Sequence, residues 1–436
     1  MTGWLALGSF LGAAAIGLPL FLAIALCTLV CFAAAGPGVS LDAGIPMMTG
    51  LWKVKEAAIL VSLPFFTLAG SIMTAGGISR RLVNFARALV GWLPGGLAVA
   101  MVLASTIFAA LSGSSAVTII AIGGILFTAL SEQGYNEKFS LGLITSCGAI
   151  GILVPPSLPL IIYGVMAGTQ PGVKAEIRDL FLAGIVPGIL CVLIMMAYAA
   201  WYGHRHKVPR PSFSWSEVWR TFKEGIFALL MPVILLVGIY GGIATVSEVA
   251  AVAVMYALVV ELFIHREIQF RKLPKIVIDS GILIGSILII LFVAMAFTNY
   301  LVDEQIPDLA AEYIQHVVHT RVGMILAINL LLLIVGSVMD IFSALVIFAP
   351  LIVPIATKAP YNLDPIHLGI IFVVNLEIGF AHPPFGINLY VAASYFKRSV
   401  MQVTLAAIPF IALLLGALAL ISFVPELTLG LVHWLH

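Results

Sequence analysis

The stretch that decides the fold is Gly151-Ile-Leu-Val-Pro-Pro-Ser-Leu-Pro159-Leu-Ile-Ile-Tyr163, together with the similar Gly379-Phe-Ala-His-Pro-Pro-Phe-Gly-Ile-Asn-Leu-Tyr390. Each contains a Pro-Pro pair inside an apolar segment that is long enough to cross a bilayer. Proline lacks the amide hydrogen and clashes with the preceding turn, so two in succession break a helix. In hydrocarbon the freed backbone groups are tolerated only where they face protein or a water-filled cavity. The two stretches therefore predict two broken transmembrane helices beside a binding cavity.

The composition is that of a polytopic membrane protein. Of the 436 residues, 62% are hydrophobic and 9% are charged, whereas soluble domains carry about 25% charged residues. The first 35 residues contain no Lys or Arg. They therefore lack the charged start of a signal peptide, and we interpret them as membrane segments that span once or twice. A net charge of +1 without a basic tail argues against nucleic acid as a partner.

Two other apolar runs are too long for a single span, and each is cut by a polar turn. The run 97–130 is interrupted at Ser112-Gly-Ser-Ser115, and the run 322–357 is interrupted at Gly336-Ser-Val-Met-Asp340. A small polar turn in the middle of such a run indicates a re-entrant hairpin, in which two half-helices enter and leave on one side. A hairpin precedes a broken helix in both halves of the chain, so the sequence predicts an internal repeat.

The distribution of positive charge indicates that the two repeats have opposite orientations. The basic loops after Tyr202 and Ile264 are placed in the cytoplasm, so that the first hairpin opens inside and the second outside. Fifteen of the 21 Lys and Arg residues then lie inside, and six lie outside: Lys53, Lys55, Lys174, Arg178, Arg321 and Lys358. We therefore predict an all-α polytopic membrane protein with an inverted repeat, two re-entrant hairpins and two broken transmembrane helices, a design used for alternating access.

These features divide the chain into seven segments. Arg80, Arg81 and Arg87 alternate with apolar residues, which is typical of a helix in the membrane interface. We expect scaffold spans in 1–75, an interfacial arm helix in 76–96, the first transport repeat in 97–168, scaffold spans with basic cytoplasmic loops in 169–300, an amphipathic connector in 301–320, the second transport repeat in 321–396 and a final scaffold span in 397–436.

The first hairpin and the first break offer neutral oxygen and amide ligands. Ser114 and Ser115 precede a half-helix whose N-terminal amides and positive dipole end suit an anion. The break at 151–155 leaves carbonyl oxygens unpaired, and these suit a desolvated alkali cation. A single turn of this kind is as often a tolerated kink whose hydroxyls bond to the preceding turn. Two paired turns in opposite orientation favour a binding site.

The second repeat differs because it carries ionisable side chains. An ionisable group inside a span is a functional candidate. Asp340 can cap the half-helix that follows it or ligate an ion directly, and we favour the cap. For Glu377, structural pairing and direct ligation are equally open. His382 can titrate or donate to substrate, although a single histidine is more often a packing residue.

Three polar side chains just beyond the breaks can line a cavity: Tyr163, Asn388 and Tyr390. Both tyrosines can equally be packing residues that are held by hydrogen bonds. No arginine is clearly placed in the core, so backbone amides and hydroxyls would have to recognise an anion.

In this order, the four motifs resemble those of the large membrane subunit of tripartite ATP-independent periplasmic (TRAP) transporters, over essentially the whole chain. The resemblance implies an elevator-type fold, similar to the ion-transporter superfamily, with a scaffold domain and a mobile transport domain. It implies sodium-coupled uptake of an organic acid anion, such as a C4-dicarboxylate or sialic acid. It also implies a small four-span membrane subunit and a periplasmic substrate-binding protein as partners in the bacterial inner (cytoplasmic) membrane, where the lipid bilayer surrounds the chain.

The resemblance further implies Na⁺ as the coupling ion at two sites. The first would use Gly113, Ser114, Ser115, Gly151, Val154 and Pro156. The second would use Gly336, Asp340, Gly379, His382 and Pro383. The candidate substrate-binding residues are Ser114, Ser115, Ser157, Tyr163, Asn388 and Tyr390. The family commonly has threonine at the position of His382, so histidine must supply a nitrogen, leave ligation to the backbone or change the coupling.

The leading hypothesis is therefore a secondary transporter and not an enzyme. Proton coupling through Asp340, Glu377 or His382 is the nearest alternative. An ion channel is a less favoured one, because channel filters generally arise from symmetric oligomers. The spans contain no paired acids, metal-ligand spacing or nucleophile-elbow pattern, which argues against an intramembrane enzyme. The chain also has no phosphate-binding Gly-Lys-Ser/Thr loop.

Overall fold

The computed structural model describes residues 8–9, 12–13, 18, 20–34, 57–170, 172–303, 305–383 and 385–435, in which every regular element is a helix. Within the segment predicted to hold the first scaffold spans, residues 35–56 and most of the apolar stretch 1–19 lie outside the described residues, as does Pro384. Within the described part, seven helices are long and apolar enough to cross a bilayer, or nine if each of two bent helix pairs is one span. The predicted all-α polytopic fold is confirmed.

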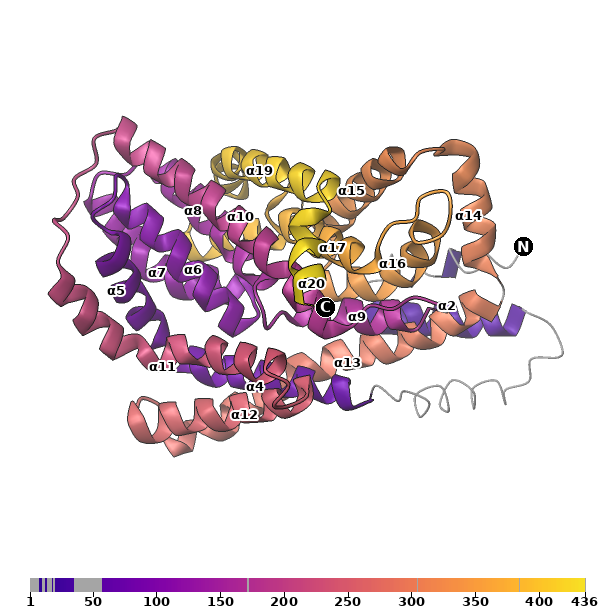
Figure 1. Ribbon diagram of the computed structural model, residues 1–436, viewed down its shortest axis with the longest axis horizontal. Coiled ribbons are helices and arrows are strands. Elements are labelled where there is room, and N and C mark those ends of the chain that lie inside the picture. Colours follow the sequence, from indigo (N-terminus) through magenta and orange to yellow (C-terminus); the bar gives the residue numbers. More distant parts are fainter. Residues whose placement is uncertain are drawn as a thin grey trace.

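Both predicted hairpins are present. The first consists of α6 (Gly96–Ser112) and α7 (Ser115–Glu132), and the second of α15 (Arg321–Val338) and α16 (Ile341–Ala356). Figure 1 shows the first hairpin in the left half of the molecule and the second in the right half. Their tips meet in the middle, where residues of both line one cavity.

Each hairpin is followed by a broken helix. In the first repeat, α8 (Glu137–Ile150) and a 3-10 turn at Gly151–Leu153 are bent by 48° relative to α9 (Leu158–Gly168). In the second, five residues separate α17 (Pro365–Ala381) from α18 (Ile387–Phe396). The prolines at both breaks lack an amide hydrogen and clash with the preceding turn, which is why neither helix continues.

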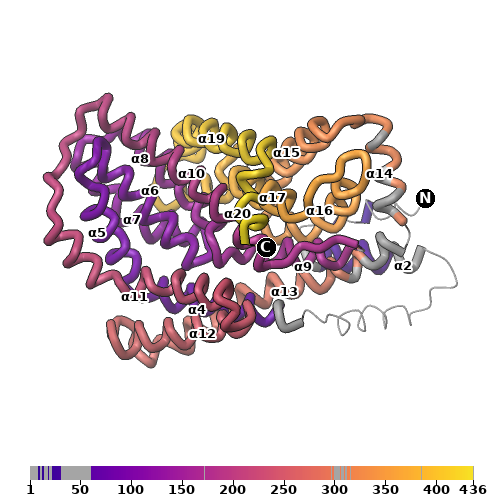
Figure 2. The backbone as a smooth tube through the Cα atoms, in the orientation of Figure 1, coloured from indigo at the N-terminus to yellow at the C-terminus, as the bar shows by residue number. Residues whose placement is uncertain are grey.

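The remaining helices surround the two repeats. They are α2 (Leu20–Ala34), α4 (Ala57–Ala75), α5 (Ile78–Val90), α10 (Ile177–Arg205), α11 (Trp215–Tyr240), α12 (Val246–Leu258) with a π-helical turn at Val259–Ile264, α13 (Leu273–Asp303) after a 3-10 turn at Phe270–Lys272, α14 (Ile306–Val317), α19 (Val400–Phe423) and α20 (Glu426–Leu435). Helices α4, α12 and α13 run side by side along one edge, below the repeats in Figure 2.

The helix predicted as an interfacial arm, α5, leaves α4 at an angle of 74°. The bend lies at Gly76 and Gly77, where an added side chain would displace the side chains of two glutamates. A Cβ atom on Gly76 would lie 2.0 Å from the Glu261 carboxylate, and one on Gly77 would lie 2.1 Å from Glu267. Glu267 also accepts a hydrogen bond from the guanidinium of Arg81 on α5 at 2.6 Å. The elbow is therefore set by close packing against the end of α12 and the loop that follows.

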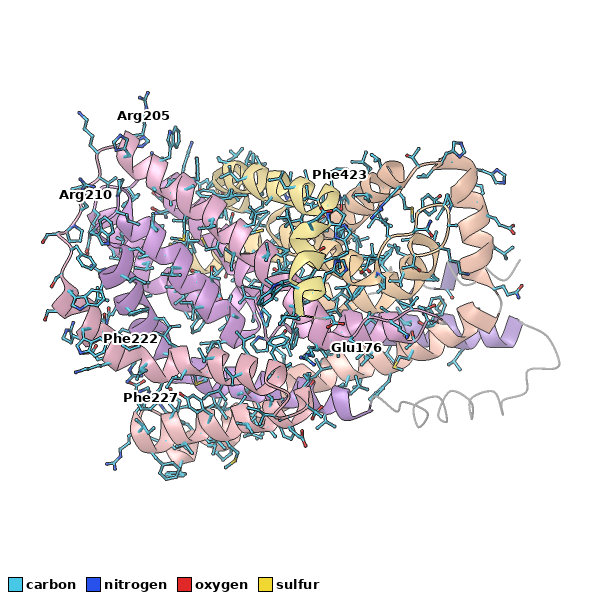
Figure 3. The ribbon with its side chains drawn as sticks, in the orientation of Figure 1. Glu176, Arg205, Arg210, Phe222, Phe227 and Phe423 are labelled. Atoms are coloured by element: carbon cyan, nitrogen blue, oxygen red, sulfur yellow. The ribbon has the colours of Figure 1, made fainter. Side chains whose placement is uncertain are left out.

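The structure adds detail within three of the predicted segments. Helix α11 begins at Trp215, because Ser214 accepts a hydrogen bond from the amide of Glu217 and caps it. Arg220 therefore lies on a helix, where it pairs with Glu217 and Glu224. The connector 301–320 contains α14, and the final span is followed by a further helix, α20. Arg205, the last residue of α10, and Arg210, which follows in the loop to α11, lie at the end of the molecule that also carries α5 (Figures 1 and 3).

Candidate substrate cavity and ion sites

A cavity of about 420 Å³ lies where the two hairpin tips meet α4 and α13. This volume is within the range of small-molecule sites, about 300–1,000 Å³. The first hairpin contributes its whole tip from Ser112 to Val117, and the second contributes Ile341 and Phe342. Helices α4 and α13 contribute polar groups to the same cavity: Thr67, Ser71, Thr74, Asp279 and Ser280.

The first hairpin tip presents the N-terminus of α7 to this cavity. Gly113 ends α6 with φ +64°, a backbone conformation that side chains rarely adopt. Ser114 then caps α7 and accepts a hydrogen bond from the amide of Val117 at 3.4 Å. The first amides of a helix have no acceptor within it, so those of Ser115 and Ala116 remain for a ligand. Together with the dipole of an 18-residue helix, they suit an anion.

A buried hydrogen bond joins this tip to the second repeat. The Ser115 hydroxyl donates to the Asn388 side-chain oxygen at 2.9 Å, and Asn388 is fully buried. Among the described residues, the Asn388 side-chain nitrogen has no hydrogen-bond partner. Asn388 thus lies directly behind Ser115 and fixes its hydroxyl.

The residues proposed for the first sodium site lie in two segments that touch. A Cβ atom on Gly151 would be 2.4 Å from the Thr106 carbonyl, so the break packs directly against α6. The Leu158 side chain would be 3.0 Å from a Cβ atom on Gly113 at the hairpin tip. The backbone turns through Val154, whose amide donates to the Gly151 carbonyl at 3.1 Å, and then through Pro155 and Pro156.

The residues proposed for the second sodium site are arranged around a contact between two backbones. A Cβ atom on Gly379 would lie 2.6 Å from the Gly336 carbonyl carbon, so α15 and α17 touch without intervening side chains. Asp340 caps α16 as predicted, since one carboxylate oxygen accepts the Ser343 amide at 2.9 Å and the other accepts the Ser343 hydroxyl. His382, next to Pro383, has a buried ring nitrogen, Nδ1, without a partner in the described part of the chain.

Glu377 does not line the large cavity. Its side chain is buried, and neither carboxylate oxygen has a hydrogen-bond partner among the described residues. It faces a separate cavity of about 20 Å³ with residues of α8, α10 and α19, namely Ala149, Ile150, Cys191 and Leu414. Nearly all buried polar groups in proteins form hydrogen bonds. A buried carboxyl group that forms none is therefore a candidate for a functional role.

The structure separates the six predicted substrate residues into two groups. Ser114 and Ser115 line the large cavity, and Asn388 lies behind them. Ser157, Tyr163 and Tyr390 are not in its lining. Ser157 caps α9 by accepting the Leu160 amide at 3.3 Å, the buried Tyr163 hydroxyl donates to the Pro365 carbonyl at 2.7 Å, and Tyr390 is 45% exposed.

The contributions of α4 and α13 were not predicted, although the sequence contains a signal for them. Thr67, Ser71 and Thr74 recur at helical spacing within an apolar span, so they share one face. Asp279 is an acidic residue near the start of another apolar span. Only the packing of these helices against the hairpin tips gives the residues a common cavity.

Comparison with known proteins identifies the family. Residues 7–427 match the family described as "Tripartite ATP-independent periplasmic transporter, DctM component". The chain belongs to this family of TRAP large permeases. It is 39% identical over 386 residues to the C4-dicarboxylate TRAP transporter large permease protein DctM of Pseudomonas aeruginosa, with 88% of each chain covered.

A second relative is the isethionate TRAP transporter permease protein DctMQ of Oleidesulfovibrio alaskensis, 37% identical over 418 residues. The match covers 94% of this chain but 63% of that longer protein. Among solved structures, the YdaH transporter of Alcanivorax borkumensis superposes with a TM-score of 0.61 over 88% of this chain and 87% of that one. The sequence identity is 15%, so this comparison establishes a similar fold and nothing more. This TRAP large permease is thus a multi-pass transport protein and not an enzyme. As a family, TRAP large permeases work with a small membrane subunit and a periplasmic binding protein.

Proposed function

We propose that this TRAP large permease takes up an organic acid anion by sodium symport across the bacterial inner membrane. The observation that carries the proposal is the 420 Å³ cavity at the hairpin tips, into which α7 directs its N-terminus. The relatives named for C4-dicarboxylate and for isethionate are both named for acidic solutes. A carboxylate or sulfonate group would bind the free amides of Ser115 and Ala116.

Sodium would bind on either side of this cavity. Hydroxyl and carbonyl oxygens of the first hairpin tip and the first break would form the first site, and the second would lie at the contact between Gly336 and Gly379, where the two backbones touch. Broken helices in transporters coordinate Na⁺ with such unwound backbone carbonyls. Sodium would hold each hairpin tip against its broken helix, and so complete the substrate site.

An elevator movement is the form of alternating access that the arrangement supports. The cavity lies between the repeats on one side and α4 and α13 on the other. A shift of the two repeats along α4 and α13 would carry the hairpin tips and their ligand from one membrane surface to the other. The substrate we propose is an organic acid anion of either the C4-dicarboxylate or the sialic acid class, delivered by a periplasmic binding protein to the complex with a four-span small subunit.

The test is uptake into proteoliposomes that hold this chain with its small subunit, supplied with the loaded binding protein. We expect uptake driven by an inward sodium gradient and abolished when sodium is replaced by choline. Equal uptake without sodium would refute symport with sodium. Saturable counterflow is expected of a carrier, whereas conduction without saturation would indicate a channel.

The same vesicles distinguish sodium from proton coupling. The observation that favours protons is the buried carboxyl group of Glu377 without hydrogen-bond partners in the described structure. Uptake that is driven by a pH gradient without sodium, and lost in Glu377→Gln, would replace the sodium proposal. Uptake by Glu377→Gln that keeps its sodium dependence would retain it.

A further inference from the structure

The cavity at the hairpin tips contains an acidic side chain, which would repel a second negative charge on a bound ligand. Its described lining contains one charged residue, Asp279 of α13, and no Lys, Arg or His. Asp279 is exposed to this cavity, and no described residue forms an ion pair with it. The neighbouring Ser280 hydroxyl is already used, because it donates to the Ile276 carbonyl at 2.8 Å.

Helix α13 holds Asp279 on the face that meets the ligand. The residues of α13 that line the cavity are Ile276, Asp279, Ser280 and Leu283, which recur at the spacing of one helical face. The first hairpin tip lines the same cavity, and its neutral amides and a hydroxyl form the part of the lining that suits an anion. The lining therefore has one part that attracts negative charge and another that repels it.

On the basis of the proposed function, we propose that Asp279 is a specificity-determining residue that selects acids with a single anionic group. It would favour the sialic acid class, which has one carboxylate, over the C4-dicarboxylates, which have two. The carboxylate or sulfonate binds the amides at the start of α7, and the far end presents a hydrogen-bond donor, either hydroxyl, amide or ammonium, to Asp279. A carboxylate accepts hydrogen bonds and pairs with cations. A second carboxylate on the ligand meets like charge and has no cation in the lining to compensate it.

Three four-carbon probes separate these cases by their far end. Succinate has a second carboxylate, succinamate has a neutral amide in its place, and 4-aminobutyrate has an ammonium group. The measurement is the shift in thermal unfolding temperature of the purified full chain in sodium-containing buffer, titrated with each probe, because a ligand that binds only the folded state stabilises it. For the wild type we expect at least tenfold tighter binding of succinamate and 4-aminobutyrate than of succinate.

The variant Asp279→Asn should abolish this preference and bind succinate about tenfold more tightly than the wild type does. Asp279→Glu retains the charge and should retain the preference. Glu312→Gln makes the same change of charge on an exposed residue of α14, which does not line the cavity, and should leave all three affinities unchanged.

Two outcomes would overturn the proposal. The wild type could bind succinate more tightly than succinamate, or Asp279→Asn could lower all affinities by the same factor, as a merely structural residue would. Either result leaves organic acid transport intact, since an acid still binds. If no acid stabilises any of the variants and uptake also fails, the proposed function itself is refuted together with the role of Asp279.

Discussion

Replacing Gly379 by alanine tests the close contact between α15 and α17 on which the second ion site depends. The added Cβ atom would lie 2.6 Å from the Gly336 carbonyl carbon and 2.7 Å from its Cα atom. Carbon atoms pack at about 3.5–4.0 Å, so one helix must move by roughly 1 Å. Backbone atoms cannot rotate away as a flexible side chain can. Overpacking of this kind destabilises a protein by about 1–3 kcal/mol.

The matched control is Gly416→Ala on α19, where an added Cβ atom has no neighbour within 4 Å. Alanine is favoured over glycine in a helix by about 1 kcal/mol, so this variant should be slightly more stable than the wild type. The assay is thermal unfolding of the purified chain with and without sodium. We expect Gly379→Ala to unfold at a lower temperature and to lose stabilisation by sodium, while Gly416→Ala keeps it. Equal unfolding temperatures for the two variants would refute the contact as described.

Three further substitutions test the placement of single side chains, each by thermal unfolding, and the last also by uptake. Glu377→Met should stabilise the protein by about 1–3 kcal/mol, because it replaces a buried carboxyl group that has no hydrogen-bond partner among the described residues by an apolar side chain of similar length, and a lower unfolding temperature would show that the carboxyl group is satisfied. Asp340→Ala should destabilise it by about 1 kcal/mol through loss of the cap of α16, whereas an unchanged temperature would show that the cap contributes nothing. Tyr163→Phe should remove about 1 kcal/mol with the hydrogen bond to Pro365 and leave uptake unchanged, and a raised KM for substrate would place this tyrosine in the cavity after all.

The breaks and turns were predictable because their causes are local. Two prolines end α8 whatever surrounds it, and the polar turn at Ser112–Ser115 cannot be buried in hydrocarbon without a cavity. Asp340 was predicted as a cap for the same reason, since the carboxylate and the amide that it binds are three residues apart.

The wall opposite the hairpin tips could not be predicted, because it depends on which helices pack there. Ser71 and Asp279 are 208 positions apart in the sequence, and neither is near a break. Tyr163 is the reverse case, because it was predicted to line the cavity and does not. It follows the first break closely in sequence, but the turns of α9 direct its ring into the protein, against Phe372 at 5.5 Å between ring centres.

The hydrogen bond between Ser115 and Asn388 ties together two positions that are 273 residues apart. Replacing either one alone leaves a buried polar group of the other without its partner, a loss of about 1–3 kcal/mol. Any effort to redesign the first hairpin tip must therefore change Asn388 in the same step, with a pair such as Ser115→Ala and Asn388→Leu. In related chains the two positions should change together, so that the residue at one indicates the residue at the other.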